Sequence, residues 1–150
     1  MHLDQAGYKL IVGLECKIYK CYKDGRGFPT IGIGHLVLPT EPELLTKQLT
    51  EQDVSNLFKK DLAIREKWLN QRCCNWEPKM QQYEFNALCS FLWQYNIDRY
   101  PDTKAVFILG HRPTIISQMK QFRNEVAGSG DNKMVARRGK EIDMFKGFVK

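Results

Sequence analysis

The sequence predicts an α+β fold that is mainly helical. Near the N-terminus, alternating apolar residues and turn residues predict a small sheet. Most of the chain after residue 50 instead repeats apolar residues with the 3.6-residue period of helices. A chain of 150 residues, 43% of them hydrophobic, has the size of one domain. We therefore predict a single domain over residues 1–150. It has a small N-terminal lobe (about 1–50), a connecting helix (51–70) and a larger helical lobe (71–150).

The first predicted element is a short amphipathic helix that ends near Glu15. Apolar residues recur at helical spacing over residues 3–14, and Asp4 stands near the start. The helix dipole disfavours a carboxylate at a helix C-terminus. Glu15 therefore needs a positive partner or surroundings that let it keep its proton.

Residues 17–35 have the pattern of a β-hairpin, extended by a third strand. Strand residues alternate up to the turn sequence Asp24-Gly25-Arg26-Gly27, and a second run follows from Phe28. We expect Pro29 to begin a strand, because proline is tolerated at that position.

Thr50 is the expected N-cap of the long connecting helix. Asp61 and Arg65 are spaced as an i, i+4 pair on that helix, either at the surface or as a buried polar link between the lobes. A dense apolar segment over 83–93 is expected to form the core helix of the larger lobe. Further helices are predicted over 103–109, 113–122 and 135–148, with breaks at Gly110 and at 127–130.

The net charge of +6 is uneven, since residues 101–150 hold ten Lys or Arg against five Asp or Glu. Nucleic acid, anionic lipid and bacterial cell wall would all be attracted by such a field. Charge is the only support for a nucleic-acid binder, because no recognition-helix motif or aromatic-and-basic strand pattern accompanies it. We therefore expect no nucleic-acid partner.

The cysteines and the N-terminus indicate where the chain folds. The cysteines number five, and the adjacent Cys73 and Cys74 rarely bridge each other, so we expect free, mostly buried thiols in a reducing cytoplasm. Residues 1–14 lack the apolar run of a signal peptide or a membrane span. The chain is thus expected to be made in a cytoplasm without a signal peptide, and not to insert stably into a membrane.

Three spaced polar residues form the motif that points to chemistry: Glu15, Asp24 and Thr30, the last of which opens the string Thr-Ile-Gly-Ile-Gly-His35. Together with Gly13-Leu-Glu15 and Tyr22-Lys-Asp24-Gly25, this pattern resembles the phage-type lysozymes, glycoside hydrolase family 24. The resemblance continues around Asp61 and Leu62 and over residues 82–91 and 136–141. It implies a lysozyme-like fold with a groove between the lobes that binds peptidoglycan.

Cleavage of a glycosidic bond needs an acid for the leaving oxygen and a second carboxylate for the developing positive charge. Glu15 and Asp24 supply these two groups. Carboxyl groups roughly 6.5 to 9.5 Å apart leave room for a water and invert the product, whereas at about 5 to 5.5 Å Asp24 would attack directly. The Thr30 hydroxyl favours water, because it can hold a nucleophilic water without competing as a base. The resemblance implies the same inverting role.

Supporting roles are expected for two further residues. The family places an arginine from the late helix against the catalytic glutamate, and Arg138 is our candidate; the alternative is that Arg137 and Arg138 are both solvated helix charges. His35 is interpreted as a hydrogen-bonded structural support, with a catalytic role as the alternative. His2, His35 and His111 have no metal-ligand spacing, so neither a metal site nor a cofactor is expected.

The chain departs from the family pattern after residue 90. Family members commonly carry Ser-Phe-x-x-Asn-x-Gly, where this chain has Ser90-Phe-Leu-Trp-Gln94-Tyr-Asn96. We expect Asn96 to replace the glycine in a left-handed turn and Gln94 to reach differently from the usual asparagine. We expect these two changes to alter the shape of the groove wall.

The predicted function is hydrolysis of the β-1,4 bond between N-acetylmuramic acid and N-acetylglucosamine. A lytic transglycosylase and a non-catalytic peptidoglycan-binding domain remain as alternatives. The resemblance implies a monomeric phage endolysin that reaches the cell wall through a separate holin-like protein. A bacterial wall-degrading toxin is the other biological setting.

Overall fold

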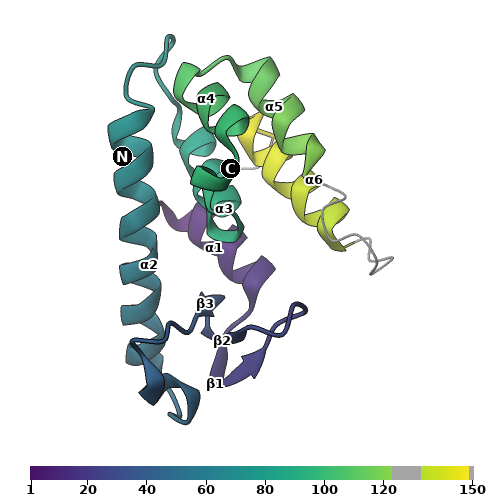
Figure 1. Cartoon of the computed structure of the whole chain (residues 1–150). Coiled ribbons are helices and arrows are strands. Elements are labelled where there is room, and N and C mark those ends of the chain that lie inside the picture. Colours follow the sequence, from purple (N-terminus) through teal and green to yellow (C-terminus); the bar gives the residue numbers. More distant parts are fainter. Residues whose placement is uncertain (123–132, 149–150) are drawn as a thin grey trace. The chain divides into compact units, whose positions relative to one another are not determined.

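The computed structural model describes residues 1–122 and 133–148, and it confirms the α+β class. The expected break at 127–130 lies outside these residues. The elements in Figure 1 are α1 (Gln5–Glu15), β1 (Ile18–Lys23), β2 (Pro29–Gly32), β3 (His35–Leu36), the 3₁₀ helix η1 (Pro42–Leu45), α2 (Glu51–Arg72), α3 (Gln82–Gln94), the 3₁₀ helix η2 (Ile97–Arg99), α4 (Pro101–Leu109), α5 (Arg112–Gln121) and α6 (Lys133–Phe145).

The chain divides into two compact units. The first, Ile11–Ile64, is called the sheet unit below; the second combines Met1–Leu10 with Arg65–Lys150 and is called the helical unit. Both boundaries fall inside helices, because α1 and α2 each begin in one unit and end in the other.

The sheet unit contains a three-stranded antiparallel sheet in the order β1-β2-β3. Tyr22 pairs with Thr30 across the first ladder, and Ile31 pairs with His35 across the second. Pro29 begins β2, as predicted. Buried aliphatic and aromatic residues of β2, of the loops beside the sheet and of α2 contribute to the core of this unit: Ile31, Ile33, Val37, Leu49, Val54 and Phe58.

The N-terminus of α2 has the cap that the sequence predicted. The backbone N–H of Asp53 donates to Thr50 Oγ1 at 3.1 Å, and the Thr50 N–H donates to Asp53 Oδ2 at 2.9 Å. Each side chain therefore satisfies a backbone donor of the other residue. The helix ends at Arg72, two residues beyond the expected end.

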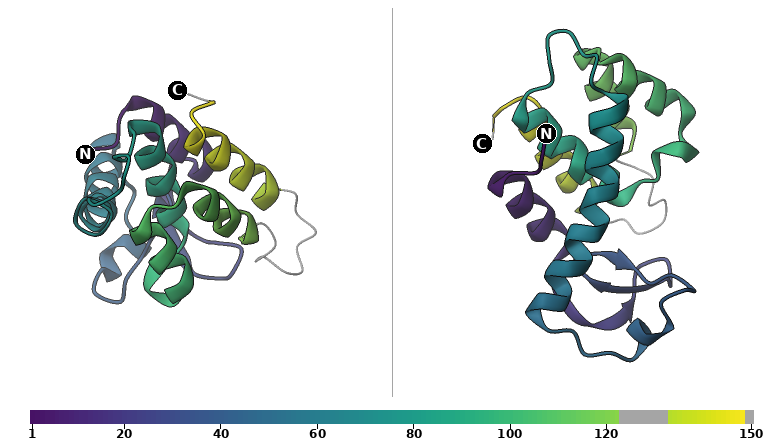
Figure 2. Two further views of the ribbon diagram at one scale, coloured as in Figure 1. Left: turned by 90° about the horizontal axis from the view of Figure 1, so that it is seen from above. Right: turned by 90° about the vertical axis from the view of Figure 1, so that its left-hand side faces the viewer.

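The helical unit is built on α3, in which every residue from Glu84 to Trp93 is buried. Helix α3 packs along α6, and α4 packs against α5 (Figure 2). Edge-to-face rings fill the space around Phe91, whose centroid lies 5.3 Å from that of Phe107 and 5.0 Å from that of Phe122. This core confirms the predicted central helix.

Gly110 ends α4 in the left-handed conformation, with φ at +79°. A Cβ at this position would lie 2.5 Å from Cγ of the buried Trp76, whose indole N–H donates to the carbonyl of Phe107 at 2.7 Å. Glycine is therefore required here both by the backbone angle and by the close approach of the ring.

Three expectations need correction. Asn96 does not adopt a left-handed turn, because its φ of −75° and ψ of 105° are extended and its side chain caps η2 by accepting from the Asp98 N–H. Helix α6 ends at Phe145 and not at 148, since Gly147 turns the chain with φ at +76°. All five cysteines are free as expected, but only Cys73 and Cys89 are buried.

Candidate active site

Glu15 lies where the sequence predicted, as the last residue of α1 in the sheet unit. The chain turns sharply directly after it, because Cys16 has a φ of +62° and its N–H donates to the Val12 carbonyl at 2.9 Å. The Glu15 side chain is half-buried. Helix α1 and the turn after it therefore fix the backbone from which the carboxyl group extends.

Asp24 stands at the turn between β1 and β2, and its carboxylate is tied to the backbone of that turn. Oδ1 accepts from the N–H groups of Arg26 and Phe28, both at 2.9 Å. Main-chain bonds at 2.9 Å run from the Asp24 N–H to the Phe28 carbonyl and from the Gly27 N–H to the Asp24 carbonyl. The tight loop thus holds one carboxylate oxygen in place.

Thr30 lies on β2 and is 5% exposed. Its hydroxyl donates to the carbonyl of Phe28 at 3.1 Å. Because the only hydroxyl hydrogen is used in this bond, Oγ1 can act only as an acceptor toward a further molecule. A water beside Thr30 would therefore donate one hydrogen to it.

Tyr22 is a site residue that the sequence analysis did not identify. It is the cross-strand partner of Thr30, and directly paired residues of an antiparallel sheet project to the same face. Burial raises the pKa of the Tyr22 phenol, and the nearby charges of Glu15 and Asp24 raise it further. Both predicted catalytic carboxylates thus lie within electrostatic range of one phenol. Its residue type and spacing are those of an ordinary residue of β1, so the sequence carried no signal for this role.

His35 is held between two carboxylates, and this geometry favours the structural role over the catalytic one. Nδ1 lies 2.8 Å from Asp61 Oδ2, and Nε2 lies 2.8 Å from Glu41 Oε2. Carboxylates only accept, so an imidazolium cation, in which both ring nitrogens donate, is the form of His35 that satisfies both bonds. The hydrogen bond to Asp61 raises the pKa of His35, although burial opposes the shift.

Glu41 completes this network and was not predicted from the sequence. Its Oε1 accepts from Lys60 Nζ at 3.1 Å, and the backbone N–H of Leu38 donates to Oε2 at 3.2 Å. Burial alone would raise the pKa of Glu41, but the bonds from His35, Leu38 and Lys60 outweigh it and lower the pKa to about 2. The network joins β3 to α2 within the sheet unit.

Arg137 and Arg138 are buried in the helical unit, with 7% and 0% of their surfaces exposed. The interpretation of both as solvated helix charges is therefore wrong. Arg138 forms an ion pair with Glu141, and its Nη2 donates to Gln94 Oε1 at 2.8 Å and to the Tyr95 hydroxyl at 3.2 Å. The pairing of Arg138 with Glu15 stays a prediction.

Asp61 and Arg65, which the sequence spaces as an i, i+4 pair, each contact a further partner. Asp61 accepts from His35 in the sheet unit. In the helical unit, Arg65 Nε donates to the Leu92 carbonyl at 3.0 Å, and the guanidinium lies 4.3 Å from the centre of the Trp93 ring. Neither side chain is fully exposed or fully buried.

Within residues 1–122 and 133–148, no group of three or more His, Cys, Asp or Glu is arranged to hold a metal ion. Over the same residues, no helix combines the length and apolar character needed to cross a membrane.

Comparison with known proteins identifies the family. The model of the phage lysozyme family matches residues 12–141, which include Glu15, Asp24, Thr30 and His35. The chain therefore belongs to the phage lysozyme family. Membership makes it a lysozyme, a glycosidase that degrades bacterial peptidoglycan. No curated protein matches the chain by sequence.

Solved structures of a phage endolysin, a lysozyme and a muramidase domain share the fold. An endolysin from the Escherichia coli O157:H7 phage FAHEc1 is 22% identical, with a TM-score of 0.80 over 99% of this chain and 96% of that one. A mutant of the P22 lysozyme is 22% identical, with a TM-score of 0.73 over 97% and 99% of the two chains. The muramidase domain of SpmX from Asticaccaulis excentricus is 20% identical, with a TM-score of 0.69 over 97% and 98%.

Proposed function

We propose that this lysozyme hydrolyses the β-1,4 bond between N-acetylmuramic acid and N-acetylglucosamine with inversion at the anomeric carbon. In the proposed reaction, Glu15 protonates the leaving glycosidic oxygen, Asp24 removes a proton from the attacking water, and Thr30 holds that water. The water oxygen bonds to the anomeric carbon as the bond to the leaving oxygen breaks. Glu15 then regains a proton from solvent, and Asp24 releases the one it took.

The observation that carries this proposal is the hydroxyl geometry of Thr30 beside the tethered Asp24. Thr30 gives its hydrogen to the Phe28 carbonyl, and the Phe28 N–H in turn fixes Asp24 Oδ1. Phe28 therefore orients both the Thr30 hydroxyl and the Asp24 carboxylate. A water that donates one hydrogen to Thr30 and the other to Asp24 keeps a lone pair for the sugar, as inversion requires.

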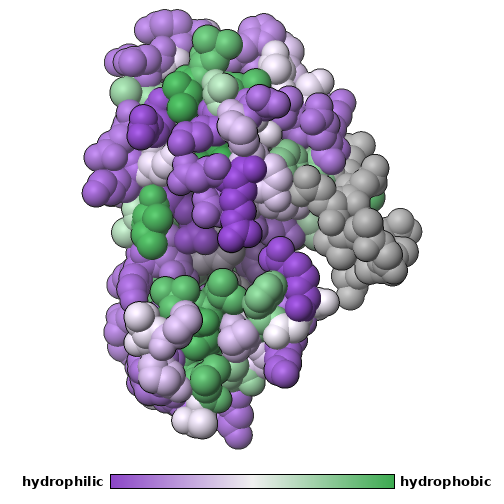
Figure 3. Space-filling view, in the orientation of Figure 1, coloured by the Kyte–Doolittle hydropathy of each residue, from purple (hydrophilic) through white to green (hydrophobic). Residues whose placement is uncertain are grey.

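Apolar surface next to this turn suits the faces of sugar rings. Figure 3 shows apolar side chains gathered on the surface of the sheet unit. Phe28 is 50% exposed, Leu36 is 46% exposed, and the Arg26 guanidinium lies 5.8 Å from the centre of the Phe28 ring. These residues could pack against the substrate beside Thr30.

The decisive experiment is a digest of purified peptidoglycan analysed by mass spectrometry and proton NMR. We expect new reducing ends that appear first as the α-anomer. Anhydro-muramic products would instead assign the chain to the lytic transglycosylases, which close the sugar's own 6-hydroxyl onto the anomeric carbon. First appearance of the β-anomer would assign Asp24 a nucleophilic role.

Two variants separate catalysis from wall binding. Glu15→Gln and Asp24→Asn keep the size of each side chain but remove its acid or base, so each should lower turnover by at least about 10²-fold. Binding to sedimented cell walls should stay within about twofold of wild type, because the substrate-contacting surface is intact. Turnover by Glu15→Gln equal to that of wild type would show that Glu15 is not the acid. A wild-type protein that binds cell walls but releases no products would support the non-catalytic alternative.

The biological setting that we propose is a phage endolysin. It would act as a monomer and depend on a separate holin-like protein that opens the membrane. Expression in the bacterial cytoplasm with and without a membrane-permeabilising protein tests this dependence, and lysis without one would contradict it.

A further inference from the structure

Gly34 lies in the turn between β2 and β3, and its missing side chain leaves the space that Glu15 occupies. A Cβ at Gly34 would lie 2.6 Å from Glu15 Oε2, 3.0 Å from Cδ and 3.3 Å from Cγ. Real Cβ atoms essentially never show a contact under 3.0 Å, so the 2.6 Å approach to Oε2 could not persist. The carboxyl group therefore lies directly over the Cα of Gly34.

Gly32, the last residue of β2, provides a contrast two positions earlier. Its φ is +66°, nearly equal to the +67° of Gly34, so both positions need glycine for the same backbone reason. A Cβ at Gly32 would meet only Leu57 and Leu49, at ordinary distances of 3.8 and 3.9 Å. Of these two glycines, Gly34 is thus the one that contacts Glu15.

His35, the residue after Gly34, holds the backbone that Glu15 contacts in place. His35 pairs with Ile31 in the sheet, and its ring is held at 2.8 Å by Asp61 on one side and at 2.8 Å by Glu41 on the other. On the opposite side of the contact, Glu15 is anchored at the end of α1. Two rigid elements therefore meet at the carboxyl group.

We infer that Gly34 is the positioning residue for Glu15: the turn that His35 anchors forms the surface against which the carboxyl group is placed for proton transfer. This inference rests on the proposed role of Glu15 as the acid. A side chain at position 34 would push the carboxyl group away and leave the fold intact, because the displaced atoms are the far end of a flexible side chain. Placement errors of about 1 Å are sufficient to lower turnover by about 10²-fold.

The test compares Gly34→Ala with the matched control Gly32→Ala on soluble peptidoglycan fragments. Both variants carry the same backbone strain, so their thermal midpoints should fall by similar amounts. We expect Gly34→Ala to lower kcat by about 10²-fold with KM within about twofold, and Gly32→Ala to lower kcat by less than about threefold. Equal losses of kcat would overturn the inference. A Gly34→Ala chain that unfolds while Gly32→Ala folds would assign Gly34 a structural role instead.

A second measurement does not depend on turnover. In a crystal structure of Gly34→Ala, the Glu15 carboxyl group should be displaced while β2, β3 and His35 keep their positions. An unmoved carboxyl group would overturn the inference.

The proposed function is tested separately, before this comparison. Wild type that releases no reducing ends, or a fully active Glu15→Gln, would refute the role of Glu15 itself. With an active wild type and an inactive Glu15→Gln, the outcome for Gly34 bears only on positioning.

Discussion

The Thr30 hydroxyl determines which nucleophile can attack in the proposed reaction, so its removal has a specific consequence. Thr30→Val keeps the shape of the side chain but has no acceptor for a water. We expect kcat on peptidoglycan fragments to fall by about 10²-fold or more, because the water loses its orientation. Thr30→Ser restores the acceptor and should retain most of the activity. A Thr30→Val enzyme as active as wild type would contradict the water-holding role.

The His35 network predicts how stability changes with pH. Because the folded state raises the pKa of His35, its contribution to the free energy of unfolding is fully present below the unfolded value of about 6.5. That contribution is lost as pH rises through the higher folded pKa. Denaturant titrations of wild type should therefore show stability falling over this range, and His35→Asn should show a flatter profile. An equal pH slope in both proteins would contradict the assignment.

The contribution of Glu41 to stability depends on pH in the opposite direction. The pKa of its carboxyl is lowered from 4.5 to about 2, so its contribution is present above about pH 4.5 and is lost as pH falls toward 2. Glu41→Gln should remove this acid-side dependence and lower stability at neutral pH. Glu43→Gln, two residues away, is the matched control and should leave the acid-side profile close to wild type.

The proposed catalytic residues Glu15, Asp24 and Thr30 could be selected from the sequence because they lie close together in the chain, and the structure places all three in one unit. Glu41 and Tyr22 could not. Glu41 contacts His35 only because a loop returns to the sheet, and Tyr22 has the ordinary pattern of a strand residue. Their roles depend on tertiary contacts that residue type and spacing do not specify.

At the scale of elements, α6 is fastened to α3 by buried charges. Glu141 is 0% exposed; its Oε1 accepts from the Ser90 hydroxyl at 2.7 Å and from Arg137 Nε at 3.2 Å, and it also pairs with Arg138. Glu141→Ala would leave two buried guanidinium groups without their shared carboxylate. We expect a loss of about 3–5 kcal/mol in the free energy of unfolding.

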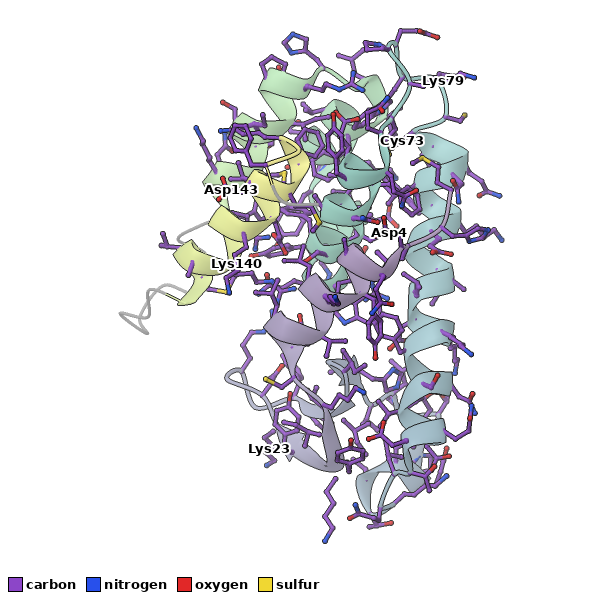
Figure 4. All side chains as sticks on the ribbon, turned by 180° about the vertical axis from the view of Figure 1, so that it is seen from behind. Asp4, Lys23, Cys73, Lys79, Lys140 and Asp143 are labelled. Atoms are coloured by element: carbon purple, nitrogen blue, oxygen red, sulfur yellow. The ribbon has the colours of Figure 1, made fainter. Side chains whose placement is uncertain are left out.

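Asp143 is the matched control for this prediction. It is a carboxylate on the exposed face of the same helix, near Lys140 (Figure 4). Asp143→Ala should change stability by no more than about 0.5 kcal/mol. Chemical denaturation of both variants makes the comparison, and equal losses would show that the buried network is not what holds α6.

The helices themselves were predictable, because apolar periodicity and caps such as Thr50 are local signals. The interior of α6 was not. Its sequence places three charged residues among the buried positions, and a hydropathy pattern assigns such residues to solvent. Their partners, which include the Ser90 carbonyl and Gln94 on α3, explain why Arg137 and Arg138 are buried.

At the scale of the whole molecule, the net charge belongs to one unit. Residues 11–64 hold seven Lys or Arg and seven Asp or Glu, so the sheet unit is neutral. The remaining 16 cationic and 10 acidic residues give the helical unit the entire charge of +6. The uneven charge could be predicted from the sequence. The division into a neutral and a basic unit could not, because the unit boundaries lie inside α1 and α2 and are known only from the structure.

This division predicts a salt-dependent attraction to the anionic cell wall that involves the helical unit. The rate of wall clearing should fall as NaCl rises from about 20 to about 200 mM, because the Debye length shortens over this range. Hydrolysis of neutral soluble fragments should change much less. The double variant Lys79→Gln/Lys120→Gln removes exposed charges of the helical unit and should weaken wall binding and its salt dependence. The control Lys20→Gln/Lys59→Gln removes as many exposed charges from the neutral sheet unit, and an equal effect there would show that total charge, and not its location, attracts the wall.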